Sequence, residues 1–146
     1  MTSHAKTKFK SGLMTASFNL NASADVRAAL CMTNTTADTE EDAEFVGSIT
    51  TLDEMDGANY ARKTLAGEAV AADLTNNRGE FDFTDPVWTA LGAGTRQVAG
   101  LLLLKFVTND ADSPAMAWID SGGFPFSANG GDFTFQVNAE GAIQTT

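Results

Sequence analysis

The sequence predicts an all-β protein: an antiparallel β-sandwich or barrel-like domain of about seven to nine short strands, with one short helix or helical turn. Two observations lead to this prediction. Apolar and polar residues alternate over short segments, and clusters of Gly, Asn, Asp and Ser separate these segments. We expect a single domain over residues 1–146, because a chain of this length can bury a core without disulfides.

A run of four leucines lies in the most apolar stretch of the chain, which predicts a β-hairpin. The alternation of a strand would place Val98, Leu102 and Leu104 on one face, and Leu101 and Leu103 on the other. A sandwich strand usually buries only one face, so another segment or another subunit must cover the second. A short buried helix is the alternative, but the nearby glycine and turn residues favour a strand.

The N-terminal region predicts a basic, extended arm over about residues 1–12. Lys6, Lys8 and Lys10 lie in it, whereas the whole chain has a net charge of −10. The arm would either fray in solvent or lie on an acidic neighbour. Residues 25–33 then predict a strand, with a short helix as the alternative because alanine favours helix.

An acidic run at residues 38–44 predicts the start of a short helical turn. Thr39 would be the N-cap, and Phe45, Val46 and Ile49 would form the apolar side. A calcium loop is the weaker alternative, because the glycine and glutamate positions that such a loop needs are not filled.

The remaining chain predicts short strands joined by turns rich in Gly and Asn. Phe81, Phe83 and Trp88 are expected in the core. Phe124 and Phe126 flank a proline in a Gly-rich loop, so they either pack under the sandwich or contact a partner. The expected strands are residues 60–65, 69–74, 81–83, 133–137 and 142–145.

Composition argues against several kinds of chemistry. The net charge of −10 disfavours nucleic-acid binding, and no apolar run approaches the roughly 20 residues of a membrane span. Cys31 and His4 are the only residues of their types, so neither an internal disulfide nor a conventional zinc site can form. We expect Cys31 to be a buried thiol, and we expect no metal, no cofactor and no catalytic activity.

Turn and core residues follow one another in a characteristic order from residue 57 onward. The segments that carry this order are Gly57–Lys63, Asn77–Phe83, Val87–Trp88, Val98–Phe106, Asp112–Pro114, Trp118–Asp120, Gly130–Thr134 and Gly141–Ile143. In this order the chain resembles small virion structural proteins of tailed bacteriophages, which are described as capsid cement or decoration proteins or as minor tail proteins. Residues 1–55 share only the basic start and the acidic stretch.

The resemblance implies a homo-oligomer, such as a trimer, that is made in the cytoplasm of a bacterial host. It would bind the outside of the phage head and stabilise contacts between subunits of the major capsid protein. Lys6, Lys8, Lys10, Phe124 and Phe126 are the candidate partner contacts. A tail or baseplate component is the alternative within this class. A soluble ligand- or carbohydrate-binding β-sandwich module is the alternative from another class.

Overall fold

The computed structural model describes residues 3–15, 18–20 and 25–145, and it confirms an all-β fold with one short α-helix. All the strand pairings among these residues are antiparallel. The helices are α1 (Thr7–Met14) and the 3-10 helix η1 (Val46–Ser48). The strands are β1 (His4–Ala5), β2 (Val26–Met32), β3 (Lys63–Thr64), β4 (Ala69–Asp73), β5 (Arg78–Asp82), β6 (Val87–Trp88), β7 (Val98–Lys105), β8 (Ala115–Ile119), β9 (Phe133–Thr134) and β10 (Ile143–Thr145).

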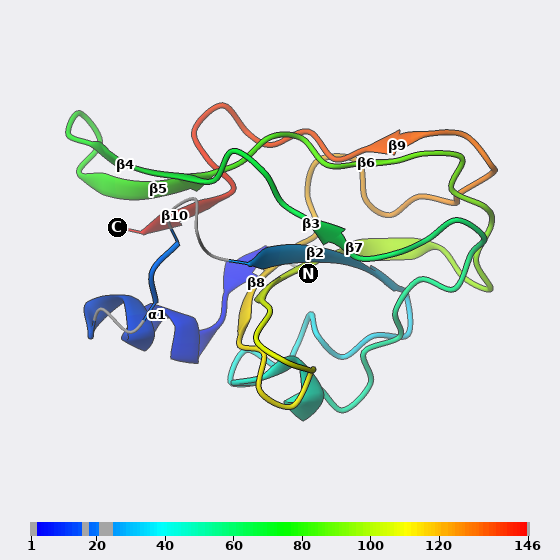
Figure 1. Ribbon diagram of the computed structural model, residues 1–146, viewed down its shortest axis with the longest axis horizontal. Coiled ribbons are helices and arrows are strands. Elements are labelled where there is room, and N and C mark those ends of the chain that lie inside the picture. Colours follow the sequence, from blue (N-terminus) through cyan, green and yellow to red (C-terminus); the bar gives the residue numbers. More distant parts are fainter. Residues whose placement is uncertain (1–2, 16–17, 21–24, 146) are drawn as a thin grey trace.

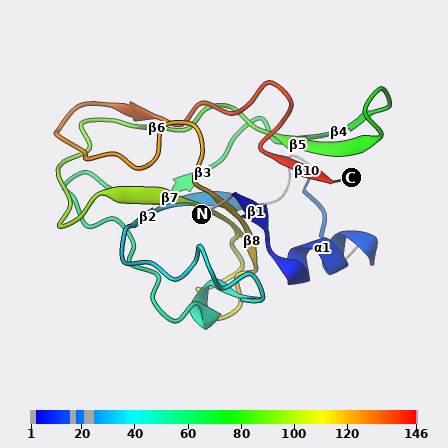
Figure 2. The same cartoon turned by 180° about the vertical axis from the view of Figure 1, so that it is seen from behind.

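The strands form a sandwich-like arrangement around a central five-stranded sheet of order β1-β8-β7-β2-β3. A three-stranded sheet, β10-β5-β4, and a two-stranded sheet, β6-β9, lie on one side of the central sheet (Figure 1). Long loops and η1 cover its other side. Helix α1 and the β4–β5 hairpin lie at one end of the molecule, and β6 and β9 lie at the opposite end (Figure 2).

Strand β7 is enclosed on both faces by its own chain. Leu101 and Leu103 pack in a core with residues of the smaller sheets, and Leu102 and Leu104 pack in a second core under the loops. All four side chains are 0% exposed. The sequence left two alternatives for the cover of the second face, another segment of this chain or another subunit. The structure shows the first, because the loops after β2 and β7 supply the cover, and it gives no support to the second.

A β-bulge changes the alternation predicted for β7. Gly100 pairs with Cys31, but Val98 pairs with Met32, so the pairing skips Ala99. The unbroken alternation had placed Val98 on the loop side, together with Leu102 and Leu104. Because of the bulge, Val98 packs on the side of the smaller sheets instead.

Residues 4–12 do not form the predicted extended arm. β1 pairs with β8, and α1 follows at once. The Lys6 side chain is 0% exposed, and its Nζ donates hydrogen bonds to the carbonyl oxygens of Ala37 (2.5 Å) and Glu40 (2.8 Å). The basic segment also forms an ion pair with the acidic run of the same chain, between Lys8 and Glu44. Residues 1 and 2 lie outside the described residues.

The position of the helices was the least predictable part of the fold. The helical turn near the acidic run exists, but it begins at Val46 with Phe45 as its N-cap rather than Thr39. Helix α1 has no side-chain N-cap bond and no acidic residue in its first turn. Burial of Phe9, which is 1% exposed, stabilises it instead.

Most predicted strands occur close to their expected positions. β2 confirms the strand interpretation of residues 25–33, and β7 and β8 form the predicted hairpin. β3 and β9 are shorter than predicted. Phe81, Phe83 and Trp88 are buried in the core, as expected.

Candidate functional site

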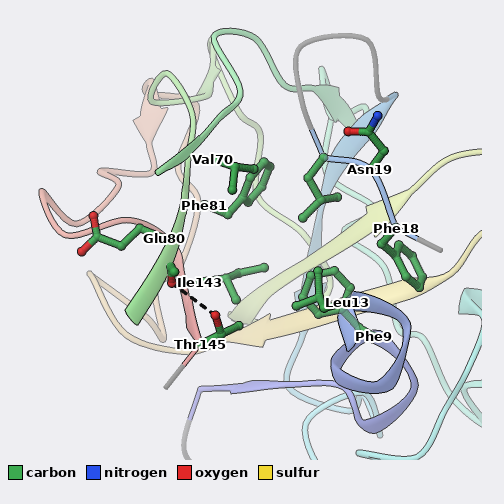
Figure 3. Close-up of a pocket in the computed structure, with 11 residues that line it drawn as sticks. Phe9, Leu13, Phe18, Asn19, Val70, Glu80, Phe81, Ile143 and Thr145 are labelled. Carbon is green, nitrogen blue, oxygen red and sulfur yellow. Dashed lines mark hydrogen bonds between the residues drawn. The ribbon is translucent and has the colours of Figure 1, made fainter. Parts of the chain in front are cut away.

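An apolar groove of about 260 Å³ opens between α1 and the three-stranded sheet, and we call it the α1 groove. Phe9 and Leu13 line it from the helix, and Val70, Phe81 and Ile143 line it from the sheet (Figure 3). Small-molecule pockets usually measure roughly 300–1,000 Å³. The α1 groove therefore fits one or two apolar side chains of a protein better than a larger ligand.

The sheet wall of the α1 groove follows directly from strand register. Val70 of β4 pairs with Phe81 of β5, and Phe81 also pairs with Ile143 of β10. Directly paired residues point to the same face of a sheet, so these three side chains form one apolar row across three strands.

The helix wall follows from the helical repeat. Phe9 and Leu13 are four residues apart and therefore share one face of α1. The ring of Phe9 meets that of Phe18 edge-on, with centroids 5.2 Å apart. This contact fixes the helix beside the chain segment that leads toward β2.

Two exposed apolar side chains lie beside or within the α1 groove. Met14 is 83% exposed, and it lines a second hollow together with Leu13 and Lys10. Val70 is 62% exposed on the opposite wall. Exposed apolar side chains gathered beside a groove are a feature of surfaces that bind another protein.

The polar residues of the α1 groove do not direct charge into it. Glu80 points away from the groove in Figure 3, and its carboxylate accepts a hydrogen bond of 2.9 Å from Arg78. The Thr145 hydroxyl donates to the carbonyl oxygen of Gly79 at 3.5 Å. The groove is therefore suited to recognise shape and apolar surface.

The three predicted lysine contacts lie in different environments. Lys6 is buried, its Nζ donates to the backbone carbonyl oxygens of Ala37 and Glu40, and it cannot contact a partner in this conformation. Lys8 forms an ion pair of 3.4 Å with Glu44 of the same chain. Lys10 is exposed at the edge of the hollow beside the α1 groove, so it alone of the three lies at the candidate site.

The two predicted phenylalanine contacts lie at the other end of the molecule. Phe124 and Phe126 are half-buried and pack against rings of their own chain. The ring of Phe126 stacks on that of Phe133 at 4.1 Å, and that of Phe124 on Phe135 at 6.1 Å. Both side chains are thus mainly structural here, and they do not form one surface with the lysines.

Sequence reasoning missed the residues that form the α1 groove. Phe9 belongs to the segment predicted as an extended arm, Leu13 and Met14 follow directly after that segment, and Val70 belongs to a strand of small residues. A helical reading of residues 7–14 would have put Phe9 and Leu13 on one face. No sequence signal places that face opposite β4.

The titratable residues close to Cys31 form a structural clamp. Arg62 donates hydrogen bonds to Glu54, the shortest of 2.7 Å, and to Asp110, at 2.5 and 2.9 Å. The Tyr60 hydroxyl also donates to Glu54, at 2.6 Å. Cys31 is 0% exposed, and burial raises the pKa of its thiol, which stays protonated at neutral pH. The prediction of a buried thiol is confirmed.

Within the described ranges, no three His, Cys, Asp or Glu side chains come together in a way that could hold a metal ion. The same residues include no helix with the length and hydropathy of a membrane span. Comparison with protein-family models, with curated proteins and with solved structures finds no match to this chain. Fold and site together describe an all-β, sandwich-like protein with an apolar groove at one end.

Proposed function

We propose that the chain is a structural protein of a tailed-phage virion, and specifically a cement protein that binds the outside of the capsid. The observation that supports a protein partner best is the α1 groove, with exposed Met14 and Val70 beside it. The resemblance of residues 57–143 supplies the virion context. The apolar faces of β7 do not support this proposal, because the chain itself covers them.

The chemistry of the groove defines the partner segment. Burial of a large apolar side chain contributes roughly 1.5–3 kcal/mol, so an apolar anchor in the groove and contact with Met14 would give a modest affinity per site. Lys10, at the edge of this surface, suits a carboxylate on the partner. Many such sites on a capsid lattice would retain the protein if each molecule makes more than one contact.

The location of the protein can be tested on intact particles. An antibody against the recombinant chain would be applied to particles from the phage that carries the gene, and labelling would be viewed by electron microscopy. We expect label on the head surface. Label on the tail would favour the tail or baseplate alternative, and absence of the chain from purified particles, checked by mass spectrometry, would overturn the virion role.

The groove itself can be tested with a charge substitution. We expect Met14→Glu to weaken binding to heads that lack this protein about tenfold or more, because it places a carboxylate at the edge of an apolar contact. Val87→Glu is the matched control, since Val87 is an exposed residue of β6 at the opposite end of the molecule. Equal co-sedimentation of Met14→Glu and wild type would exclude the groove as the contact.

A further inference from the structure

Strand β4 is the longest strand at the edge of a sheet in the described part of the chain. It has five residues and pairs only with β5. The other edge strands of the two larger sheets are β1 and β3, with two residues each, and β10, with three. A long free edge offers backbone groups to another strand, and proteins usually shield such edges.

The edge of β4 lacks the usual shielding. Ala69, Val70, Ala71 and Ala72 are all exposed, and none of them is charged or a proline. Asp73 ends the strand, but its carboxylate lies 3.1 Å from Arg78 and accepts a hydrogen bond of 2.6 Å from the side-chain amide of Asn76. The edge is therefore uncharged over four residues, and the following carboxylate is neutralised within its own hairpin.

We propose that β4 pairs in antiparallel fashion with β4 of a second copy of this chain. A two-fold axis at Ala71 would place Ala71 opposite Ala71 of the partner subunit and Val70 opposite Ala72 of the partner subunit. The two three-stranded sheets then form one six-stranded sheet. This contact is isologous, so it closes with two chains and not with the three that the resemblance implies.

The proposed register keeps the acidic residues of the two copies apart. Each chain has a net charge of −10, so two copies repel overall, and a contact between them requires a surface where no acidic residues face each other. The proposed register satisfies this condition, because Asp73 lies opposite Ala69 and Glu68 opposite Leu74 of the partner subunit. The uncharged run, Ala-Val-Ala-Ala, also presents small residues in both directions, so strand pairing meets no steric obstacle.

The position of the hairpin leaves space for a second molecule. The turn between β4 and β5 lies at the extreme end of the long axis in both views (Figures 1 and 2). Because the two-fold axis is perpendicular to the sheet, both α1 grooves would open on the same side of the dimer. This consequence rests on the proposed function: a dimer would offer a capsid two grooves at once.

A cysteine pair tests the register. In the proposed dimer Ala71→Cys lies opposite its own copy, at a distance that a disulfide can bridge. Glu68→Cys is the matched control immediately before the same strand, because residue 68 would lie about 20 Å from its own copy at roughly 3.4 Å per residue. We expect mild oxidation to give a covalent dimer of Ala71→Cys and little of Glu68→Cys. Equal cross-linking of the two variants would overturn the register.

A lysine substitution tests whether the edge of β4 mediates dimerisation, and it does not depend on forming a disulfide. We expect the wild type to dimerise with rising concentration in sedimentation velocity, Ala72→Lys to remain monomeric, and Val107→Lys to behave like the wild type. Val107 is an exposed apolar residue in the loop between β7 and β8, away from β4. Circular dichroism would show that each variant is folded.

The possible outcomes separate this proposal from the virion role. A wild type that stays monomeric up to the highest soluble concentration would overturn β4 pairing, as would dimers that survive Ala72→Lys. A monomer that binds heads would leave the virion role intact. A β4-linked dimer that is absent from particles would overturn only the virion role.

Discussion

Strands β7 and β4 are both apolar in sequence, but β7 is buried in the fold and β4 is exposed. β7 lies between β2 and β8, and its residues Leu101–Leu104 are 0% exposed. β4 pairs with β5 alone, and Val70 within it is 62% exposed. The comparison shows that an apolar sequence makes a strand suitable for burial. Whether the strand is buried depends on the strands and loops that pack against it.

The largest expected effect comes from removing a leucine from β7. Leu103→Ala should lower the free energy of unfolding by about 2–5 kcal/mol, because it leaves a cavity in a packed core. Leu103 is 0% exposed in the core shared with the smaller sheets. Urea denaturation followed by circular dichroism would measure the change. A loss below about 1 kcal/mol would mean that β7 is less tightly enclosed than the structure shows.

The loops that cover the second face of β7 depend on the Arg62 clamp. Arg62→Met keeps most of the side-chain volume but removes the hydrogen bonds to Glu54 and Asp110, so we expect a loss of about 1.5–3 kcal/mol. Lys8→Met is the matched control, because Lys8 and Glu44 are exposed and such pairs contribute about 0–1 kcal/mol. Similar urea midpoints for both variants would contradict a special role for the clamp.

The same contrast explains how much of the fold could be predicted from sequence. Local patterns were sufficient for β2, β4, β5 and the β7–β8 hairpin, because strand alternation and turn residues are encoded locally. Local patterns did not predict which segments cover the second face of β7, because these segments are loops without a regular sequence pattern. Helix α1 was missed because its stability depends on the burial of Phe9 rather than on capping residues.

The candidate site was less predictable than the fold. Charge and aromatic character drew attention to Lys6 and Phe124, which the structure uses mainly for its own packing. The α1 groove instead combines α1 with β4, β5 and β10, which lie far apart in the sequence. Their meeting depends on sheet order, which the spacing of residues does not reveal.

A smaller effect is expected on acidification of the clamp. Hydrogen bonds from Arg62 hold the pKa of Asp110 below its usual value of 3.8. A carboxyl group with a lowered pKa in the folded state stabilises the fold fully above the unfolded pKa, and this contribution is lost as pH falls through the folded pKa. The wild type should therefore lose stability below about pH 4.

Urea midpoints measured from pH 6 to pH 3 would test this dependence. Other carboxyl groups contribute, since Asp53 has its pKa lowered by its hydrogen bond with Arg96. The informative quantity is therefore the difference between the wild type and Arg62→Met, which should narrow as the pH falls. A constant difference across this range would show that ionisation of Asp110 does not contribute.

The smallest expected effect on stability lies at the edge of β4. Val70→Thr keeps a β-branched side chain of similar shape on a surface that is already exposed to water, so the free energy of unfolding should change by no more than about 0.5 kcal/mol. The measurement should be made at a concentration where the chain is monomeric, because self-association would otherwise add to the apparent stability. At higher concentration the same substitution should weaken dimerisation, since Val70 becomes buried only when β4 acquires a neighbour. A loss of more than about 1 kcal/mol in the monomer would mean that Val70 is already packed within one chain, and β4 would then resemble β7 instead of contrasting with it.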